Sequence, residues 1–198
     1  RGDLSISYRS LGDVYKSKGK LKDAKSMYLQ ALEISKALAE ETKTVESLRG
    51  LVISYGRLGG IYKSEGKLEE AKEMYLQALE ISKALAEETK AVGSRRDLAI
   101  SYGRLGDIYE SEGKLEEAKE MYLQALEISK TLAKKTKTVL TYNDWAISHY
   151  RLVHVSEEKR THLQAAYDIW SALATQCPNV AKYAQRRDIV KSKLDSLN

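Results

Sequence analysis

The sequence predicts an all-α fold, an α-solenoid of stacked helix-turn-helix repeats, from three observations. Its 198 residues contain one segment three times at a spacing of 47 residues, which aligns Tyr8, Tyr55 and Tyr102. A glycine recurs at the same spacing, as Gly19, Gly66 and Gly113. The second half of each copy is rich in strong helix formers, and the whole chain has a single Pro. Repeats of this length stack because one unit cannot bury its own apolar face.

In the first copy, the spacing of apolar residues predicts a helix over residues 2–17. Its face is formed by Leu4, Tyr8, Leu11 and Tyr15. Gly19 stands just after this helix, where a left-handed residue closes the last turn. A second helix is expected from Leu21 to about Thr42, with a buried stripe of Ala24, Tyr28, Ala31 and Leu32.

The second and third copies repeat the same pair of helices. We expect helices over residues 45–64, 68–89, 94–112 and 115–136. The connections between them are short, as antiparallel neighbouring helices require.

The fourth copy begins faithfully at Ser148 and then diverges. It lacks the turn glycine, resumes the apolar stripe as Leu163, Ala166, Trp170 and Leu173, and ends at Pro178. A last segment echoes the start of a repeat and is interpreted as a C-terminal capping helix. The expected organisation is a single array, with repeats at 1–47, 48–94, 95–141 and 142–178 and the cap at 179–198. Because only the C-terminal end has diverged, further repeats are expected before Arg1.

Charge and cysteine content narrow the class of protein. The 33 basic and 28 acidic residues give a net charge of +5, a small excess on a mixed surface that lacks the basic stripe of a nucleic-acid binder. The single cysteine, Cys177, favours a reducing compartment, so we expect a cytoplasmic protein. No apolar run approaches the roughly 18 residues of a membrane span, and no membrane partner is expected.

Candidate chemistry is sparse. The soft metal ligands are His149, His154, His162 and Cys177, and their spacing fits no zinc pattern. His149 replaces an aromatic residue of the first-helix stripe and is interpreted as a packed core histidine. The sequence has no glycine-rich phosphate loop and no nucleophile elbow. We therefore expect no enzyme activity, no cofactor and no metal site.

The residues of each copy resemble a tetratricopeptide repeat. The third copy carries the family pattern as Tyr102, Leu105, Gly106, Tyr109, Ala118, Tyr122 and Ala125. The repeat is longer than the usual unit of about 34 residues. It is most similar to the long-helix variant of kinesin light chains and of bacterial multi-repeat proteins. The resemblance implies a right-handed superhelix, first helices along the concave side, binding of other proteins, and no catalysis.

A helix turns about 100° per residue, so the side of each first helix opposite the core can be identified from spacing. The resemblance places this side in the concave groove. Isoleucine and arginine recur there in successive copies, although each Ile could pack on a neighbouring helix and Arg104 could pair with Asp107 or an adjacent copy. The candidate peptide-binding residues are Arg9, Ile53, Arg57, Ile100, Arg104, Asp107 and Arg151.

The resulting hypothesis is a protein-interaction scaffold that binds a peptide or protein segment of acidic and apolar character in the groove. An alternative is an architectural array that self-associates end to end through its uncapped, apolar N-terminal face. A more remote alternative is a helical-repeat RNA binder, although near-identical copies would read the same base each time. The family's clamp for chaperone C-terminal tails fits poorly, because Asp13 would repel a carboxylate.

Overall fold

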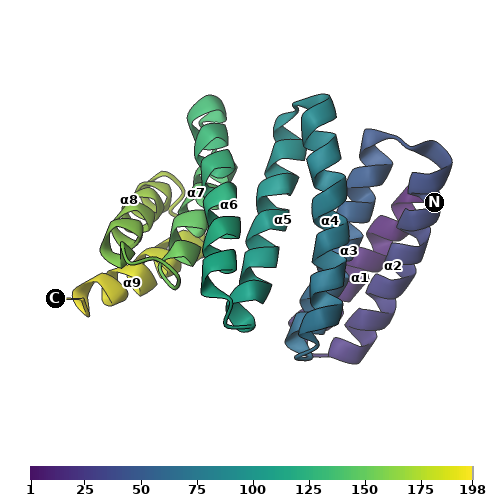
Figure 1. The fold of residues 1–198 in the computed structure, drawn as a ribbon, viewed down its shortest axis with the longest axis horizontal. Coiled ribbons are helices and arrows are strands. Elements are labelled where there is room, and N and C mark those ends of the chain that lie inside the picture. Colours follow the sequence, from purple (N-terminus) through teal and green to yellow (C-terminus); the bar gives the residue numbers. More distant parts are fainter. Residues whose placement is uncertain (198) are drawn as a thin grey trace. The chain divides into compact units, whose positions relative to one another are not determined.

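We describe residues 1–197 in a computed structural model. This part of the chain forms nine α-helices and no strand (Figure 1). The helices are α1 (Gly2–Ser17), α2 (Leu21–Thr42), α3 (Val45–Ser64), α4 (Leu68–Thr89), α5 (Val92–Ser111), α6 (Leu115–Thr136), α7 (Val139–Leu152), α8 (Lys159–Gln176) and α9 (Ala181–Asp195). The predicted bounds of α1, α2, α3, α4 and α6 are confirmed.

The chain folds as two compact units. The first, Arg1–Glu112, holds α1 to α5, and in it each helix packs against the next while α3 also touches α1 and α5. The second begins at Gly113, and in it α6 packs on α7, α7 on α8 and α8 on α9. Consecutive helices within a unit run antiparallel, as Figure 1 shows. The predicted class, an all-α solenoid of helical repeats, is confirmed.

Two kinds of residue end the helices in a left-handed conformation. The predicted glycines have φ values of 71°, 75° and 76° at Gly19, Gly66 and Gly113. The second helices of the repeats end instead at a lysine with φ of 51°, at Lys43, Lys90 and Lys137. The glycines meet no steric penalty there, whereas a lysine carries a Cβ that disfavours this conformation.

The start of α5 differs from the prediction by two residues. Ser94 is the first residue of this helix in the prediction from sequence. In the structure Ser94 is the third residue of the helix and is buried, and its hydroxyl accepts a hydrogen bond from Thr89 Oγ1 at 2.9 Å. The helix therefore starts earlier, at Val92, after Ala91, which offers no side-chain cap.

A tyrosine lying over a glycine forms the core of each helix pair in the first unit. Tyr28 and Tyr75 are buried, and their rings lie against α1 and α3. A Cβ added to Gly12 would come within 2.5 Å of the Tyr28 ring, and one added to Gly59 within 2.6 Å of Tyr75. The Leu-Gly pattern of the first two copies is thus explained, because only glycine leaves room for the ring.

The first helix buries less than its counterpart one repeat later. Leu4 and Leu11 are 50% and 42% exposed, whereas Leu51 and Leu58, which stand 47 residues later, are 8% and 2% exposed. In α3 this side packs on α2, and no helix of the described chain covers it in α1. The N-terminal face of α1 is therefore apolar and open, as the sequence predicted.

The diverged C-terminal copy retains its core but has a shorter first helix. The predicted stripe of Leu163, Ala166, Trp170 and Leu173 is buried. Helix α9 adds Tyr183, Val190 and Leu194 to the same cluster, in keeping with a cap.

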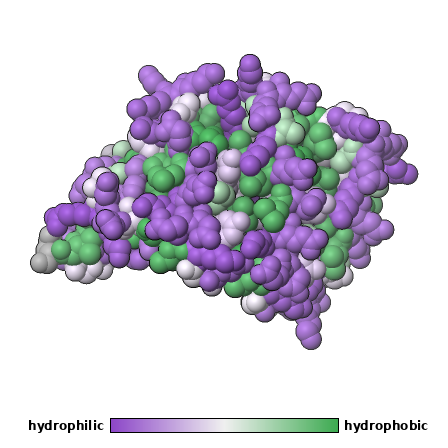
Figure 2. Space-filling model, in the orientation of Figure 1, coloured by the Kyte–Doolittle hydropathy of each residue, from purple (hydrophilic) through white to green (hydrophobic). Residues whose placement is uncertain are grey.

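Outside the cores, most of the surface seen in Figure 2 is hydrophilic, and apolar side chains form separate patches.

Candidate functional site

The candidate groove residues of the first unit lie at two successive contacts between repeats. We call the contact of α1 and α2 with α3 the first interface, and the contact of α3 and α4 with α5 the second interface. Arg9, Ile53 and Arg57 belong to the first, and Arg104 to the second. The sequence aligns the two interfaces residue for residue, so differences between them can be traced to single substitutions.

At the first interface, Arg57 pairs with the preceding repeat. Its Nη2 lies 3.0 Å from Asp13 Oδ2, and both side chains are about two-fifths exposed, at 43% and 41%. The buried Tyr28 hydroxyl donates to the other carboxylate oxygen, Oδ1, at 2.5 Å. Burial, followed by this hydrogen bond, raises the pKa of Tyr28. Asp13 therefore ties α1, α2 and α3 together.

At the second interface, the equivalent arginine has a different neighbourhood. Gly60 stands where Asp13 stands in the first copy, so this carboxylate is missing. The Arg104 guanidinium lies instead against Gly56, so that a Cβ added to Gly56 would be 1.7 Å from Arg104 Nη1. The Cζ atom of Arg104 is 6.0 Å from the centre of the Tyr75 ring. Arg57 and Arg104, identical in the sequence pattern, thus have different partners.

Arg9 points from α1 into the first interface. Its Nη1 donates to the backbone oxygen of Gly50 at 2.9 Å and to Ser54 Oγ at 3.4 Å. Burial lowers the pKa of Arg9, and the nearby charge of Arg57 lowers it further, while Asp13 partly opposes the shift. Arg9 is therefore a half-buried cation that lies near both an acid, Asp13, and a second cation, Arg57.

A pocket of about 740 Å³ opens beside Arg9 at the first interface. Its walls come from α1, the C-terminal half of α2 and the N-terminal half of α3. Two of the predicted site residues, Arg9 and Ile53, line it. Other lining residues were not predicted, and they are Gly2, Ser5, Ile6, Ser35, Leu38, Thr42, Thr44, Val45, Glu46, Ser47, Arg49 and Gly50.

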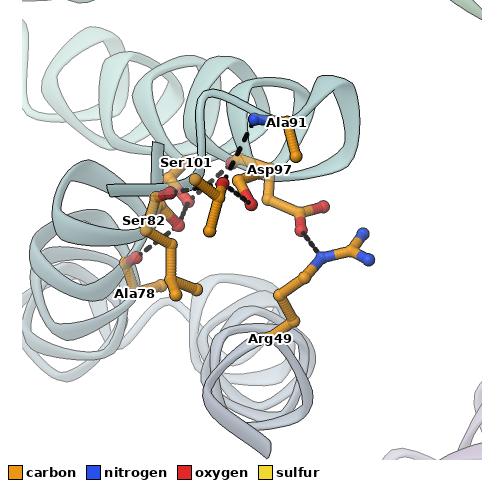
Figure 3. Close-up of polar contacts among 9 residues, drawn as sticks. Arg49, Ala78, Ser82, Ala91, Asp97 and Ser101 are labelled. Carbon is orange, nitrogen blue, oxygen red and sulfur yellow. Dashed lines mark hydrogen bonds and ion pairs between the residues drawn. The ribbon is translucent and has the colours of Figure 1, made fainter. Parts of the chain in front are cut away.

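An ion pair occupies the matching place at the second interface. Arg49 Nε donates to Asp97 Oδ2 at 2.6 Å (Figure 3). This hydrogen bond is the main cause of the raised pKa of Arg49. The residues 47 positions earlier are Gly2 and Gly50, which have no side chain to fill the space. Aligning the copies would have revealed this signal, which our sequence reasoning missed.

Buried serines join each second helix to the next first helix, and sequence reasoning missed these too. The hydroxyls of Ser82 and Ser101 lie 3.1 Å apart, and they donate to the backbone oxygens of Ala78 and Asp97 (Figure 3). The same pairing recurs between Ser35 and Ser54 at 2.9 Å and between Ser129 and Ser148 at 3.0 Å. Each serine thus has a partner in its apolar surroundings.

The other predicted groove residues are more scattered. Ile100 is half-buried on α5, and the backbone oxygen of Asp107 accepts a bond from Lys63 Nζ at 3.3 Å. Arg151 belongs to the second unit, where it lies half-buried in the last turn of α7. The structure therefore gathers Arg9, Ile53 and Arg57 at one interface.

A histidine pair lies in the second unit. His149 Nδ1 and His162 Nδ1 are 3.1 Å apart, which places both half-buried rings in the contact between α7 and α8. Burial, with smaller contributions from His162 and Lys130, lowers the pKa of His149 to about 4.

The described residues contain no group of three or more side chains that could hold a metal ion. None of the described helices is both long and apolar enough to cross a membrane.

Comparisons with known proteins agree with these features. Two family models described as tetratricopeptide repeat match residues 50–131 and 7–38. No curated protein sequence matches the chain. Among solved structures, BtubC (BKLC) from P. vanneervenii has a TM-score of 0.54 at 19% identity, over 98% of this chain and 82% of that chain. A putative kinesin light chain from Podosopora anserina with nearly identical TPR-like repeats has a TM-score of 0.54 at 15% identity, over 98% and 97%.

The matched ranges contain the tyrosine–glycine cores of the first unit, with Gly12 and Tyr28 in one range and Gly59 and Tyr75 in the other. The two solved structures match 98% of this chain, and at this low identity the match shows a common fold. This chain belongs to the tetratricopeptide repeat family, and its fold is that of kinesin light chain-like repeat proteins.

Proposed function

We propose that this chain is a protein-interaction scaffold that binds an acidic and apolar segment of another protein along the first-helix side of its repeats. Tetratricopeptide repeats generally mediate protein–protein interaction or scaffolding. The observation that carries the finer proposal is the first interface, where an apolar pocket adjoins the half-buried Arg9. A carboxylate on the segment would supply the negative charge that pairs with Arg9. Apolar side chains of the same segment would cover the exposed Ile6. The proposed role involves no catalysis.

The experiment begins with partners captured from a lysate of the source organism, each then purified and measured separately by calorimetry. The test variant is the double substitution Arg57→Ala with Arg104→Ala. The control is Glu33→Ala with Glu80→Ala, which removes two exposed charges from the second helices α2 and α4. Thermal unfolding of both variants checks that the repeats remain folded. We expect the arginine variant alone to weaken binding, and unchanged affinity for every purified partner would refute groove binding.

A second candidate function is end-to-end self-association through the N-terminal face. The observation that favours it is the exposure of Leu4, Leu11 and Val14, whose counterparts Leu51, Leu58 and Ile61 are buried. Contact between two such faces would remove apolar surface from water. Sedimentation should then show a mass that rises with concentration, and Leu4→Lys with Leu11→Lys should abolish the rise. A constant monomer mass would exclude this candidate.

A further inference from the structure

The pocket at the first interface owes its existence to two glycines. Gly2 and Gly50 occupy the positions that hold Arg49 and Asp97 at the second interface. Neither position is too crowded for a side chain. A Cβ added to Gly2 would lie 3.8 Å from Leu38, and one added to Gly50 would lie 3.7 Å from Arg9. The space of about 740 Å³ is within the usual range for ligand pockets. Side chains at these two positions would therefore fit between the helices and fill the pocket, which the two glycines leave open.

The walls of the pocket suit an apolar group. Ile6 and Val45 are exposed large hydrophobic residues, and Leu38 and Ile53 are half-buried beside them. A bound apolar side chain would remove their surface from water, at about 25 cal/mol per Å². The serine and threonine hydroxyls that line the pocket are already hydrogen-bonded to one another or to backbone oxygens. An apolar guest would therefore leave none of these hydroxyls unsatisfied.

The charges around the pocket favour an anion. Arg9 and Arg49 both line it, against one acid, Glu46, at the start of α3. Within the described chain Arg9 donates through Nη1, which leaves its Nε and Nη2 donors for a ligand. Arg49 is held by Asp97 through Nε. Arg9 is therefore the guanidinium best placed to bind a carboxylate.

We propose that this pocket receives a large aliphatic side chain of the bound segment while the carboxylate of a neighbouring acidic residue binds Arg9. The inference rests on the proposed function and identifies the part of the groove that selects the segment. The occupant is thus a leucine-sized residue next to glutamate or aspartate. The second interface cannot receive the same pair, because Arg49 and Asp97 fill the corresponding space.

The probes that test this are three blocked dipeptides, N-acetyl-Leu-Glu-amide, N-acetyl-Leu-Lys-amide and N-acetyl-Gly-Glu-amide. Each is titrated into methyl-labelled protein while the methyl resonances of Ile6, Leu38 and Ile53 are followed by NMR. We expect saturable shifts with Leu-Glu, and binding weaker by about tenfold when either the carboxylate or the leucine is replaced. Equal affinity for Leu-Glu and Leu-Lys, or shifts at other methyls, would overturn the proposal.

The matched variant is Gly2→Arg with Gly50→Asp, which transplants the ion pair of the second interface into the first. It should lose binding of Leu-Glu by about tenfold or more, because the new side chains fill the pocket. Ile6→Lys offers an independent variant on an exposed residue that is expected to fold. Unchanged binding in both folded variants would contradict the proposed pocket.

The same variants separate this inference from the proposed function. Suppose a purified partner loses affinity for the Arg57→Ala, Arg104→Ala variant but binds the Gly2→Arg, Gly50→Asp variant normally. This result would support binding in the groove and contradict binding in the pocket. A partner that is insensitive to the arginine substitutions, beside a dipeptide that binds as expected, would overturn the groove and keep the pocket as a side-chain site.

Discussion

The first and second interfaces are formed by equivalent helices of successive repeats, and they differ in the side chains that make contacts across them. At the first, Asp13 holds Arg57, and Gly2 and Gly50 leave a pocket. At the second, Arg49 and Asp97 fill that place, and Arg104 lies against Gly56. In this chain, the shared tyrosine–glycine cores set the packing of the helices, while a few substitutions on the first-helix side decide whether an interface is open or closed.

The largest expected loss of stability should be equal in the helix pairs α1–α2 and α3–α4, which stand on the two sides of the first interface. Gly12→Ala and Gly59→Ala each force a Cβ against a buried tyrosine ring, at 2.5 and 2.6 Å. Overpacking a rigid core costs about 1–3 kcal/mol, and we expect the upper part of that range in the free energy of unfolding. Urea denaturation followed by circular dichroism measures it. A loss at only one of the two positions would break the equivalence of the cores.

The next effect should distinguish the two ion pairs. Asp97 is 11% exposed in its pair with Arg49, whereas Asp13 is 41% exposed in its pair with Arg57. We expect Asp97→Ala to cost about 2 kcal/mol, because it leaves a partly buried guanidinium unpaired. A double-mutant cycle at each pair gives the coupling energies, and the exposed Asp13–Arg57 pair should contribute only about 0.2–1 kcal/mol. A larger coupling for Asp13–Arg57 would reverse our ranking of the two interfaces.

A third prediction extends the comparison to the diverged copy, where His149 replaces Tyr55 and Tyr102 of the earlier copies. Its pKa is lowered to about 4 in the folded state, chiefly by burial, so protonation favours the unfolded chain. The groups acting on it are His162 and Lys130, and Glu158 acts on His162. Stability should be fully present above the ordinary histidine pKa of about 6.5 and should fall as the pH is lowered towards 4.

The measurement is thermal unfolding between pH 7 and pH 4 by circular dichroism. The control is His149→Tyr, which restores the aromatic residue of the other copies and removes one of the two titrating rings. A pH dependence that is the same in this variant and in the original chain would show that His149 is not its cause.

The smallest effect is expected at Gly56. The three atoms nearest an added Cβ there all belong to the end of the Arg104 side chain, which we expect to move aside, and alanine gains about 0.5–1 kcal/mol over glycine inside a helix. Gly56→Ala should therefore be neutral or slightly stabilising, although Gly59→Ala three residues later is strongly destabilising. Urea denaturation of the two variants side by side tests this. A marked loss with Gly56→Ala would mean that Arg104 is held firmly in place.

Much of the fold could be predicted because it depends on local spacing. The helix periodicity, the glycines after the first helices and the tyrosine–glycine pattern lie within one copy, and the structure confirms them. The start of α5 was placed two residues too late, although Val92 stands 47 residues after Val45, where α3 begins, so the repeat spacing itself gives the observed start. The left-handed lysines were not predicted, since lysine has no intrinsic preference for that conformation.

The candidate site was predicted less completely. Arg9 and Ile53 do line a pocket, and the remaining groove residues stay predictions. The serine pairs and the Arg49–Asp97 pair were missed because each joins residues of two different helices, at separations of 19 and 48 residues. No spacing rule within a single helix can reveal such partners.

The sequence by itself determined the repeat, the helix pairs and the residues of the core, because a period of 3.6 residues and a fixed repeat spacing place the same side chains inward in every copy. Only the tertiary structure decided the partners of Arg57 and Arg104. A guanidinium reaches beyond its own helix to a carboxylate or a glycine on the preceding repeat, so identical arginines have different partners where those neighbours differ.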